Sequence, residues 1–230
     1  MRVELLKRLN EARGNRRAVI VATNLEDGSA RLVLEGESVS GELGVALDKA
    51  FRSGRSGTVE ADARFYFLNV HVPPARLVVI GAVHIAQSLA PMARIAGFDV
   101  RIIDPRTAFA TLERFSDTEL IAEWPDEVLA QKPLDAYTAL AAVSHDPKID
   151  DFPLKAALEA KCFYVGALGS RKTHAKRIER LRKLGLGDEQ IAGIASPIGL
   201  DIGAASPQEI AVAILAEIIG ALRKRQVSVR

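Results

Sequence analysis

The fold is decided by the stretch RLVVIGAVHIAQSLAPMARIAGFDVRIID, residues 76–104. Its first apolar run is rich in β-branched residues, which are typical of a strand buried on both faces of a parallel sheet. Gly81 ends that run, and the apolar residues of 84–96 recur at the spacing of an amphipathic helix. A second apolar run, at 98–103, ends in Asp104. Strand, glycine turn, helix, strand and acid form the opening unit of a dinucleotide-type, Rossmann-like α/β fold.

The turn after the first strand departs from the glycine fingerprint of nicotinamide-binding proteins. The pattern Gly-x-Gly-x-x-Gly/Ala reads Gly81-Ala-Val83-His-Ile-Ala86 here. Gly81 can make the tight turn, and Ala86 permits close packing of helix on strand. Val83 stands where a glycine lets the backbone approach a pyrophosphate, and a β-branched residue disfavours positive φ. We therefore expect the fold with only weak NAD(P) binding, although Asp104 stands at about the position of a ribose-binding acid.

The composition is that of an ordinary globular chain of 230 residues, with 48% hydrophobic and 26% charged residues. The net charge of +2 gives no indication of a nucleic-acid partner. A single cysteine, Cys162, excludes an internal disulfide, and we expect it to be a buried, inert thiol. No apolar run reaches the ~18 residues of a membrane span, and residues 1–17 lack the apolar core of a signal peptide. These features predict a cytoplasmic protein.

Pro73-Pro74 interrupts backbone pairing and marks the expected boundary between two domains. Residues 1–72 are predicted to form a small α+β domain, and residues 73–230 a larger Rossmann-like domain. In the small domain we expect helices at 3–13 and 41–51 and strands at 17–23, 30–34 and 64–72, with a break around Gly54 and Gly57. In the large domain we expect further strands at 119–123, 137–143 and 163–167, a last strand or loop at 197–202, a loop with a short helix at 107–115, and helices at 126–130, 150–160, 173–184 and 206–224.

Two helix starts carry capping signals. Ser206, Pro207 and Glu209 form a capping box at the start of the last helix. Asp150 or Asp151 is the expected N-cap of the helix at 150–160.

Four polar clusters fall at the carboxyl ends of predicted parallel strands, where ligands of such sheets bind. The first contains Gly81 and His84; His84 could offer an N–H to a ligand oxygen, or could serve as a capping or packing histidine. The second contains Asp104 and Arg106. Asp104 could bind a ribose or a pterin-like polar edge while Arg106 holds a phosphate, or the two could form a turn pair that fixes the strand end.

The third cluster, His145-Asp146-Pro-Lys-Ile-Asp150-Asp151, brings a histidine and three carboxylates together. His145 and Asp146 could contact a ligand or act as a general base, or the segment could be a polar loop before a helix. Neither H-x-x-x-H nor C-x-x-C spacing occurs, so we predict no metal site.

The fourth cluster reads Gly166-Ala-Leu-Gly169-Ser170-Arg171 and precedes a basic helix. Flexible glycines, a hydroxyl, a guanidinium and the helix N-terminus can converge on an anion, so we predict anion binding here. The order of a Walker A loop is absent. The basic residues that follow on one helical stripe are expected to form a solvated face: Lys172, Lys176, Arg180 and Lys183.

Six segments together resemble the XdhC/CoxI family, accessory proteins of xanthine and carbon monoxide dehydrogenases. They are GAVHIAQ (81–87), DPRTAFAT (104–111), SHDPKIDD (144–151), YVGALGSR (164–171), SPIGLDIGA (196–204) and SPQEIAVAILAE (206–217). The resemblance implies a chaperone that binds molybdenum cofactor, protects it during sulfuration and delivers it to an apo-dehydrogenase. It implies an apo-molybdoenzyme partner, and a cysteine desulfurase is a further candidate partner. The last helix could provide a homodimer face.

In that interpretation the cofactor phosphate sits on the Gly166–Arg171 loop. His145 and Asp146 line the pocket, and Asp104 with Arg106 contacts the pterin or a nucleotide extension. Two rival interpretations are a nicotinamide-dependent oxidoreductase that uses Gly81 and Asp104, and a protein–protein adaptor without a working pocket.

The N-terminal part departs from the family pattern. Members often carry Gly-Ser-Val-Ser-Gly-Gly-Cys-Val-Glu, whereas residues 37–45 here read ESVSGELGV, with Leu43 at the cysteine position. The sequence offers no thiol there for cofactor or sulfur chemistry, and we do not expect the protein to carry a persulfide.

Overall fold

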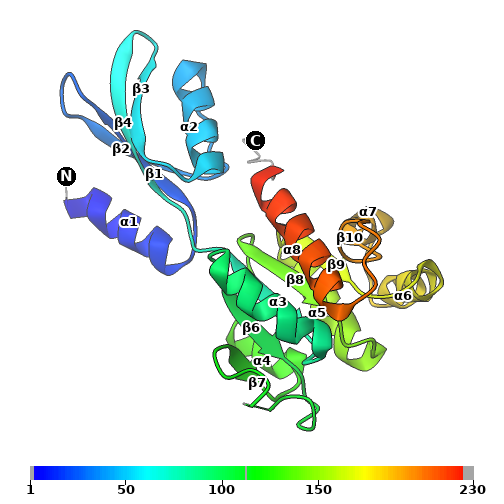
Figure 1. Ribbon diagram of the computed structural model, residues 1–230. Helices are drawn as coiled ribbons and strands as arrows, with labels where there is room; N and C mark the ends of the chain where they lie inside the picture. The colour runs from blue at the N-terminus through cyan, green and yellow to red at the C-terminus, as the bar shows by residue number, and fades with distance from the viewer. Residues whose placement is uncertain (1–2, 112, 225–230) are drawn as a thin grey trace. The chain divides into compact units, whose positions relative to one another are not determined.

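The computed structural model describes residues 3–111 and 113–224 (Figure 1). The chain divides into two compact units: one spans Pro74–Leu222, and the other contains the chain up to Pro73 together with Arg223 and Lys224. The first point of division falls between Pro73 and Pro74. The outermost parts of the predicted domains, residues 1–2 and 225–230, lie outside the described residues.

The smaller unit is an antiparallel sheet of order β2-β1-β4-β3 with two helices. Its elements are α1 (Val3–Gly14), β1 (Val19–Asn24), β2 (Ala30–Leu34), α2 (Gly41–Ser53), β3 (Gly57–Ala61) and β4 (Arg64–His71). The expected break flanked by Gly54 and Gly57 is present, but the strand β3, which begins at Gly57 and pairs with β4, was missed. β3 is an edge strand whose residues alternate between exposed and partly buried, so it lacks the apolar run that marks a buried strand.

The larger unit is a six-stranded parallel sheet of order β10-β9-β8-β5-β6-β7. This is the strand order of a Rossmann fold, with β5 as its first strand. The strands are β5 (Arg76–Ile80), β6 (Asp99–Ile103), β7 (Glu119–Ile121), β8 (Thr138–Ala142), β9 (Tyr164–Ala167) and β10 (Ile194–Ala195). The helices are α3 (His84–Ile95), α4 (Pro125–Gln131), α5 (Pro147–Glu159), α6 (Arg171–Lys183), α7 (Asp188–Ala192) and α8 (Pro207–Lys224).

Helices cover both faces of this sheet, as the unbroken apolar run of β5 predicts. Leu77 and Val79 belong to a core that includes Leu89 of α3 and Ile214 of α8. The intervening Val78 and Ile80 belong to a second core, built with residues of α4, α5 and α6. Figure 1 shows α3 and α8 lying over the same face of the sheet. The Rossmann-like α/β prediction is therefore confirmed.

Two local predictions in this unit were wrong, and one short strand was missed. Asp146, not Asp150 or Asp151, caps α5, because its carboxylate accepts the Lys148 backbone N–H at 2.9 Å. The expectation of a strand or loop at 197–202 is met by a loop, and the last strand, Ile194–Ala195, was missed. Residues 107–111 and 113–115 form turns without a helix.

The predicted capping box at α8 is present. The Glu209 carboxylate accepts the Ser206 backbone N–H at 2.9 Å, and the Ser206 hydroxyl accepts the Glu209 N–H at 3.2 Å. Within the described ranges, no helix is long and apolar enough to cross a membrane.

Candidate functional site

The carboxyl ends of β5 and β8 meet at the point where the strand order reverses. Gly81 follows β5 with a φ of +112°, and a Cβ built there would lie 2.8 Å from both the backbone nitrogen and the Cα of Ser144. Only glycine tolerates both this backbone conformation and this contact. Gly81 therefore brings the first and third predicted clusters together.

Asp104 joins the first cluster to the second. Its fully buried carboxylate accepts the Ala82 backbone N–H at 2.7 Å and two guanidinium bonds from Arg106, at 2.9 Å from Nε and 2.8 Å from Nη2. Burial alone would raise the pKa of Asp104, but the bonds from Arg106 and Ala82 outweigh it, and the pKa lies below its usual value. Asp104 thus forms the strand-end pair with Arg106, and its carboxylate is enclosed. The Arg106 side chain is partly exposed and lies over the Phe109 ring, 4.6 Å from the centroid.

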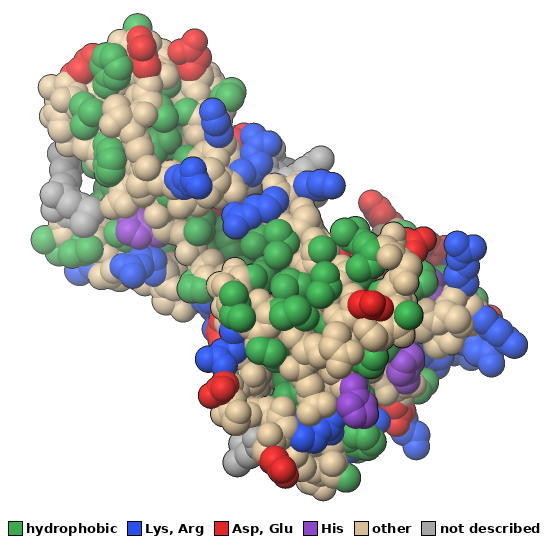
Figure 2. All heavy atoms as spheres, in the orientation of Figure 1, with side chains coloured by type: hydrophobic (Ala, Val, Ile, Leu, Met, Phe, Trp, Pro, Cys, Tyr) green, Lys and Arg blue, Asp and Glu red, His purple; other side chains and the backbone are tan. Residues whose placement is uncertain are grey.

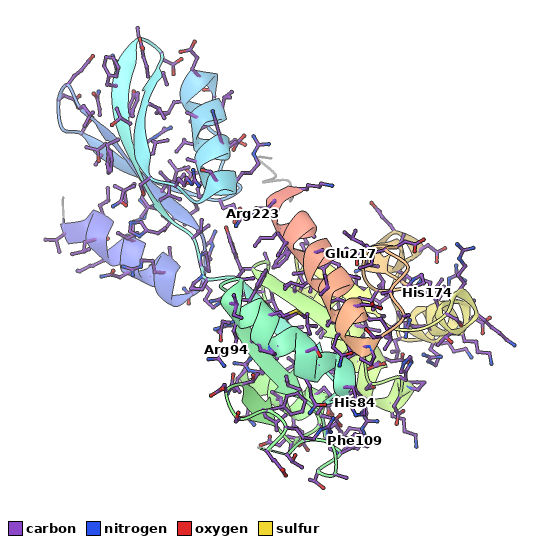
Figure 3. The ribbon with its side chains drawn as sticks, viewed as in Figure 1. His84, Arg94, Phe109, His174, Glu217 and Arg223 are labelled. Atoms are coloured by element: carbon purple, nitrogen blue, oxygen red, sulfur yellow. The ribbon has the colours of Figure 1, made fainter. Side chains whose placement is uncertain are left out.

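The N-terminus of α3 opens beside this pair. Val83 is the N-cap with a φ of −94°, so the expected conflict between valine and positive φ does not arise. His84 follows and is exposed. Figure 3 shows His84 and Arg94 at opposite ends of α3, with Phe109 near the His84 end. Arg114 ties this loop to the helix, because it donates to the Phe109 carbonyl and to Gln87 Oε1.

The third cluster is a compact polar turn. Ser144 Oγ donates to Asp150 Oδ1 at 2.7 Å and accepts the Asp146 backbone N–H at 3.0 Å. His145 between them is exposed and has a φ of +65°, which non-glycine residues rarely adopt. Asp150 is only 2% exposed, and burial raises its pKa to about 6.

The fourth cluster forms the start of α6. Ser170 is the N-cap and accepts the Thr173 backbone N–H at 3.3 Å. Gly169 has a φ of +137°, and a Cβ there would meet Thr173 at 3.1 Å. Gly166 has a packing role instead, because a Cβ there would lie 2.5 Å from the Tyr164 hydroxyl. Arg171 is exposed and has no hydrogen-bond or ion-pair partner among the residues that the structure describes.

Sequence reasoning missed Arg177 of α6, which is 2% exposed. Its Nη2 donates to the Leu168 carbonyl at 2.7 Å, while its buried Nε has no partner within the described part of the chain. The available signal was its position four residues before the buried Leu181, on the inward stripe of the helix. Next to it, Arg180 pairs with Asp151 through bonds of 2.5 and 3.0 Å.

A pocket of about 290 Å³ lies between the third cluster and α6. Four of its lining residues are cations of α6, so its wall is strongly positive. Figure 2 shows Lys and Arg side chains gathered at the right of the view, where α6 lies in Figure 1. Lys172 and Lys176 are exposed, as expected for a solvated face, and together with Arg180 they also line this pocket. The lining residues are His145, Pro147, Asp150, Lys172, Thr173, Lys176, Arg177 and Arg180.

All four clusters thus converge on the carboxyl edge of the sheet. Ala82 contacts Asp104, Gly81 abuts Ser144, and the charge of Arg106 acts on Asp146 and Asp150. Within the described residues, no three histidine, cysteine or acidic side chains are grouped to hold a metal ion. Besides the carboxylates of Asp104, Asp146 and Asp150, the convergent groups are cations, hydroxyls and backbone N–H donors, and these suit an anionic ligand.

Of the two sulfur-related positions, Leu43 is buried and Cys162 is partly buried. Leu43 is buried in α2 and borders a polar pocket of about 480 Å³ in the smaller unit. Burial raises the pKa of the Cys162 thiol to about 12, so this thiol is unreactive at neutral pH.

The sequence and the fold of this chain are similar to those of known proteins. The curated relatives that the chain matches include the uncharacterized protein YqeB of Escherichia coli (strain K12), which is 35% identical over 66% of this chain and 28% of its own length. The molybdenum cofactor insertion chaperone PaoD of the same strain is 32% identical over 64% of this chain and 40% of its own length. A probable xanthine dehydrogenase subunit of Bacillus subtilis (strain 168) is 34% identical over 64% of this chain and 43% of its own length. The chain spans less than half the length of these relatives.

A solved structure from Bacillus halodurans, described as a xanthine dehydrogenase, shares the fold. It aligns over 96% of this chain and 67% of its own, with a TM-score of 0.66 and 24% identity. The family model of the XdhC Rossmann domain matches residues 77–218. That range is more than half of the chain and contains all four strand-end clusters, and the protein therefore belongs to the XdhC family.

Proposed function

We propose that this protein binds molybdenum cofactor and passes it to a dehydrogenase-type molybdoenzyme. One observation carries the proposal: four polar strand ends converge on one edge of a Rossmann sheet, beside a pocket walled by cations. The relative PaoD is named a molybdenum cofactor insertion chaperone, and another relative is named a probable xanthine dehydrogenase subunit. Both names support a role in maturation.

The residues present fit an anionic, phosphate-bearing pterin. Two arginines have N–H donors available to oxygen ligands. One is the buried Arg177, whose Nε–H lacks a partner within the described chain, and the other is Arg171, which is also unpaired there. We place the cofactor phosphate at the start of α6, on Gly169, Ser170 and Arg171. The cofactor is cargo here, and it supplies redox chemistry only to the enzyme that receives it.

The remaining contacts surround the pterin in this proposal. His145 lines the pocket from the third cluster, whereas the Asp146 carboxylate beside it caps α5. His84 approaches from the first turn of α3. Arg106 offers its partly exposed guanidinium to the polar edge or to a nucleotide extension. Asp104 supports Arg106 rather than touching the ligand, because its carboxylate is enclosed.

The finer parts of the role follow as proposals. The receiving enzyme is of the xanthine or carbon monoxide dehydrogenase type, and the handover takes place in the cytoplasm. Sulfuration of the bound cofactor would depend on a cysteine desulfurase, because Leu43 replaces the family cysteine and the Cys162 thiol is unreactive. The exposed surface of α8 is the candidate homodimer face. The nicotinamide-dependent rival is disfavoured, because the ribose-binding acid it requires is engaged by Arg106.

Transfer to an enzyme tests the proposal. Purified protein loaded with molybdenum cofactor is mixed with an apo-dehydrogenase, and cofactor in each protein is quantified after separation. We expect the cofactor to move to the apo-enzyme faster than from free solution. Equal rates with and without this protein would contradict the chaperone role.

A further inference from the structure

The pocket between α5 and α6 has a buried guanidinium in its wall. Arg177 is 2% exposed, and its Nη2 is held by the Leu168 carbonyl at 2.7 Å. Its Nη1 is 3.5 Å from Ser196 Oγ, and its Nε–H lacks a partner among the described residues. A buried charged donor without an acceptor is costly, and native proteins rarely leave one unless something binds it.

Nearby acidic groups neutralise only part of the positive charge around Arg177. Asp151 is held by Arg180, which leaves Asp150 as the nearby carboxylate. Asp150 is buried, and one of its oxygens already accepts from Ser144 Oγ. Lys172 and Lys176 add cations to the lining. The pocket therefore has more positive than negative charge.

We propose that this pocket binds a tetrahedral dianion, such as a phosphoryl group, with Arg177 as its innermost ligand, and that Asp150 takes up a proton as the anion enters. This anion site does not rest on the proposed function, and its anion is not the cofactor phosphate placed at the start of α6. It differs from the placement on Gly169 and Arg171, because neither residue lines the pocket.

Proton uptake follows from the position of Asp150 in the lining. With burial holding its pKa near 6, Asp150 is ionised at pH 8 in the free protein. A dianion nearby raises that pKa further, so binding between pH 8 and pH 6 draws in a proton and tightens as pH falls. The charged or titratable groups that face Asp150 are Arg106, His145, Asp146, Asp151, Arg177 and Arg180.

Sulfate is the appropriate probe, because it stays a dianion throughout this range. Calorimetric titration of the full chain at pH 8 and pH 6 should show affinity rising by about tenfold. Asp150→Asn should bind with equal affinity at both values. His145→Asn, chosen because asparagine tolerates positive φ, should keep the pH dependence and so assign it to Asp150.

Arginine variants locate the anion. Arg177→Gln should weaken sulfate binding by about ten- to a hundredfold. Arg182→Gln is the matched control, because Arg182 lies on the same helix outside the pocket. Arg171→Gln should leave intact the shift that sulfate causes in the Arg177 Nε–H resonance, because Arg171 does not line the pocket. If Arg177→Gln melts early, the Nε–H resonance of Arg177 in the wild-type protein still decides, since sulfate should shift it.

Each result has one meaning. The site is overturned if sulfate does not shift the Arg177 resonance. It is also overturned if sulfate affinity is lost in Arg171→Gln and kept in Arg177→Gln. Persistent pH dependence in Asp150→Asn overturns the proton coupling. Sulfate binding as described, in a protein that does not bind molybdenum cofactor, would refute the proposed function and leave this site standing.

Discussion

The backbone N–H of Ala82, at the end of β5, donates a 2.7 Å hydrogen bond to Asp104 Oδ2, at the end of β6. An acid at this place in a Rossmann sheet is expected to reach a ribose. Here the same carboxylate is closed over by Arg106 and is fully buried. The acid therefore holds two strand ends together and orients a guanidinium.

Asp104→Ala should lower the free energy of unfolding by about 3–5 kcal/mol, because it leaves Arg106 and the Ala82 N–H without their acceptor. Urea unfolding measures this. Asp99→Ala is the control: Asp99 pairs with Arg76 at 3.4 Å, but its side chain is 55% exposed, so the cost should stay below about 1 kcal/mol. Equal losses in the two variants would contradict the structural role of Asp104.

Gly81→Ala should destabilise the protein by about 2–5 kcal/mol, from a left-handed backbone and from the new Cβ against Ser144. Gly97→Ala is the matched control, since its φ is +89° and nothing lies within 4 Å of the added Cβ. That variant should lose only the free energy of unfolding that comes from the left-handed backbone, about 1–2 kcal/mol. If thermal melting shows equal losses, the Ser144 contact contributes nothing.

Asp150→Asn should stabilise the protein at pH 8 and have little effect at pH 4. The pKa of Asp150 is raised by burial to about 6, so the folded state holds a proton that the unfolded state releases between about pH 4 and pH 6. Stability from this group is complete below the unfolded pKa and is lost as pH rises through the folded value. The stabilisation at pH 8 should be at most about 3 kcal/mol. Unfolding at both pH values checks this, and a larger gain at pH 4 would reverse the assigned sign.

NAD(P)H should bind more weakly than about 1 µM, and Val83→Gly should not restore tight binding. The backbone at Val83 is already unstrained, while the ribose-binding acid is closed off by Arg106. Calorimetric titration of both proteins is the test. A dissociation constant of 1 µM or tighter, about −8 kcal/mol, would favour the oxidoreductase.

The elements with strong local signals were predictable. The β-branched run before Gly81 indicated the central strand, and Ser206 with Glu209 indicated the start of α8. Elements without such signals were missed, since β10 has two residues and β3 lies at a sheet edge. The cap of α5 was misassigned although Pro147, directly after Asp146, is the residue expected at the first helical position.

The candidate site was predictable as a set of strand ends, but its internal contacts were not. Parallel strands bring their carboxyl ends to one edge, so the convergence of the clusters follows from topology. Whether Asp104 faces a ligand or Arg106 depends on side-chain geometry. Arg177 was not predicted because a cation in a basic helix is usually solvated, and its burial depends on tertiary contacts with the Leu168 carbonyl and Ser196 Oγ.

The start of α6 provides a local test of the cofactor site. Arg171→Ala should weaken cofactor binding by about ten- to a hundredfold, without a change in melting, because Arg171 has no partner within the described chain. Gly169→Val should weaken it at least as much, but it should also lower the melting temperature because of its φ of +137°. Unchanged cofactor affinity in Arg171→Ala would mean that the cofactor phosphate binds at another place.

The most direct test of the proposed chaperone role is the affinity of the purified protein for molybdenum cofactor. Pterin absorbance and bound phosphate, measured after gel filtration, report how much cofactor the protein retains. We expect retention of one cofactor per chain with a dissociation constant in the micromolar range or tighter, about −8 kcal/mol. The exposed control variant Arg182→Ala should retain the cofactor equally. A wild-type protein that elutes without pterin or phosphate, after incubation with excess cofactor, would contradict cofactor binding by this chain.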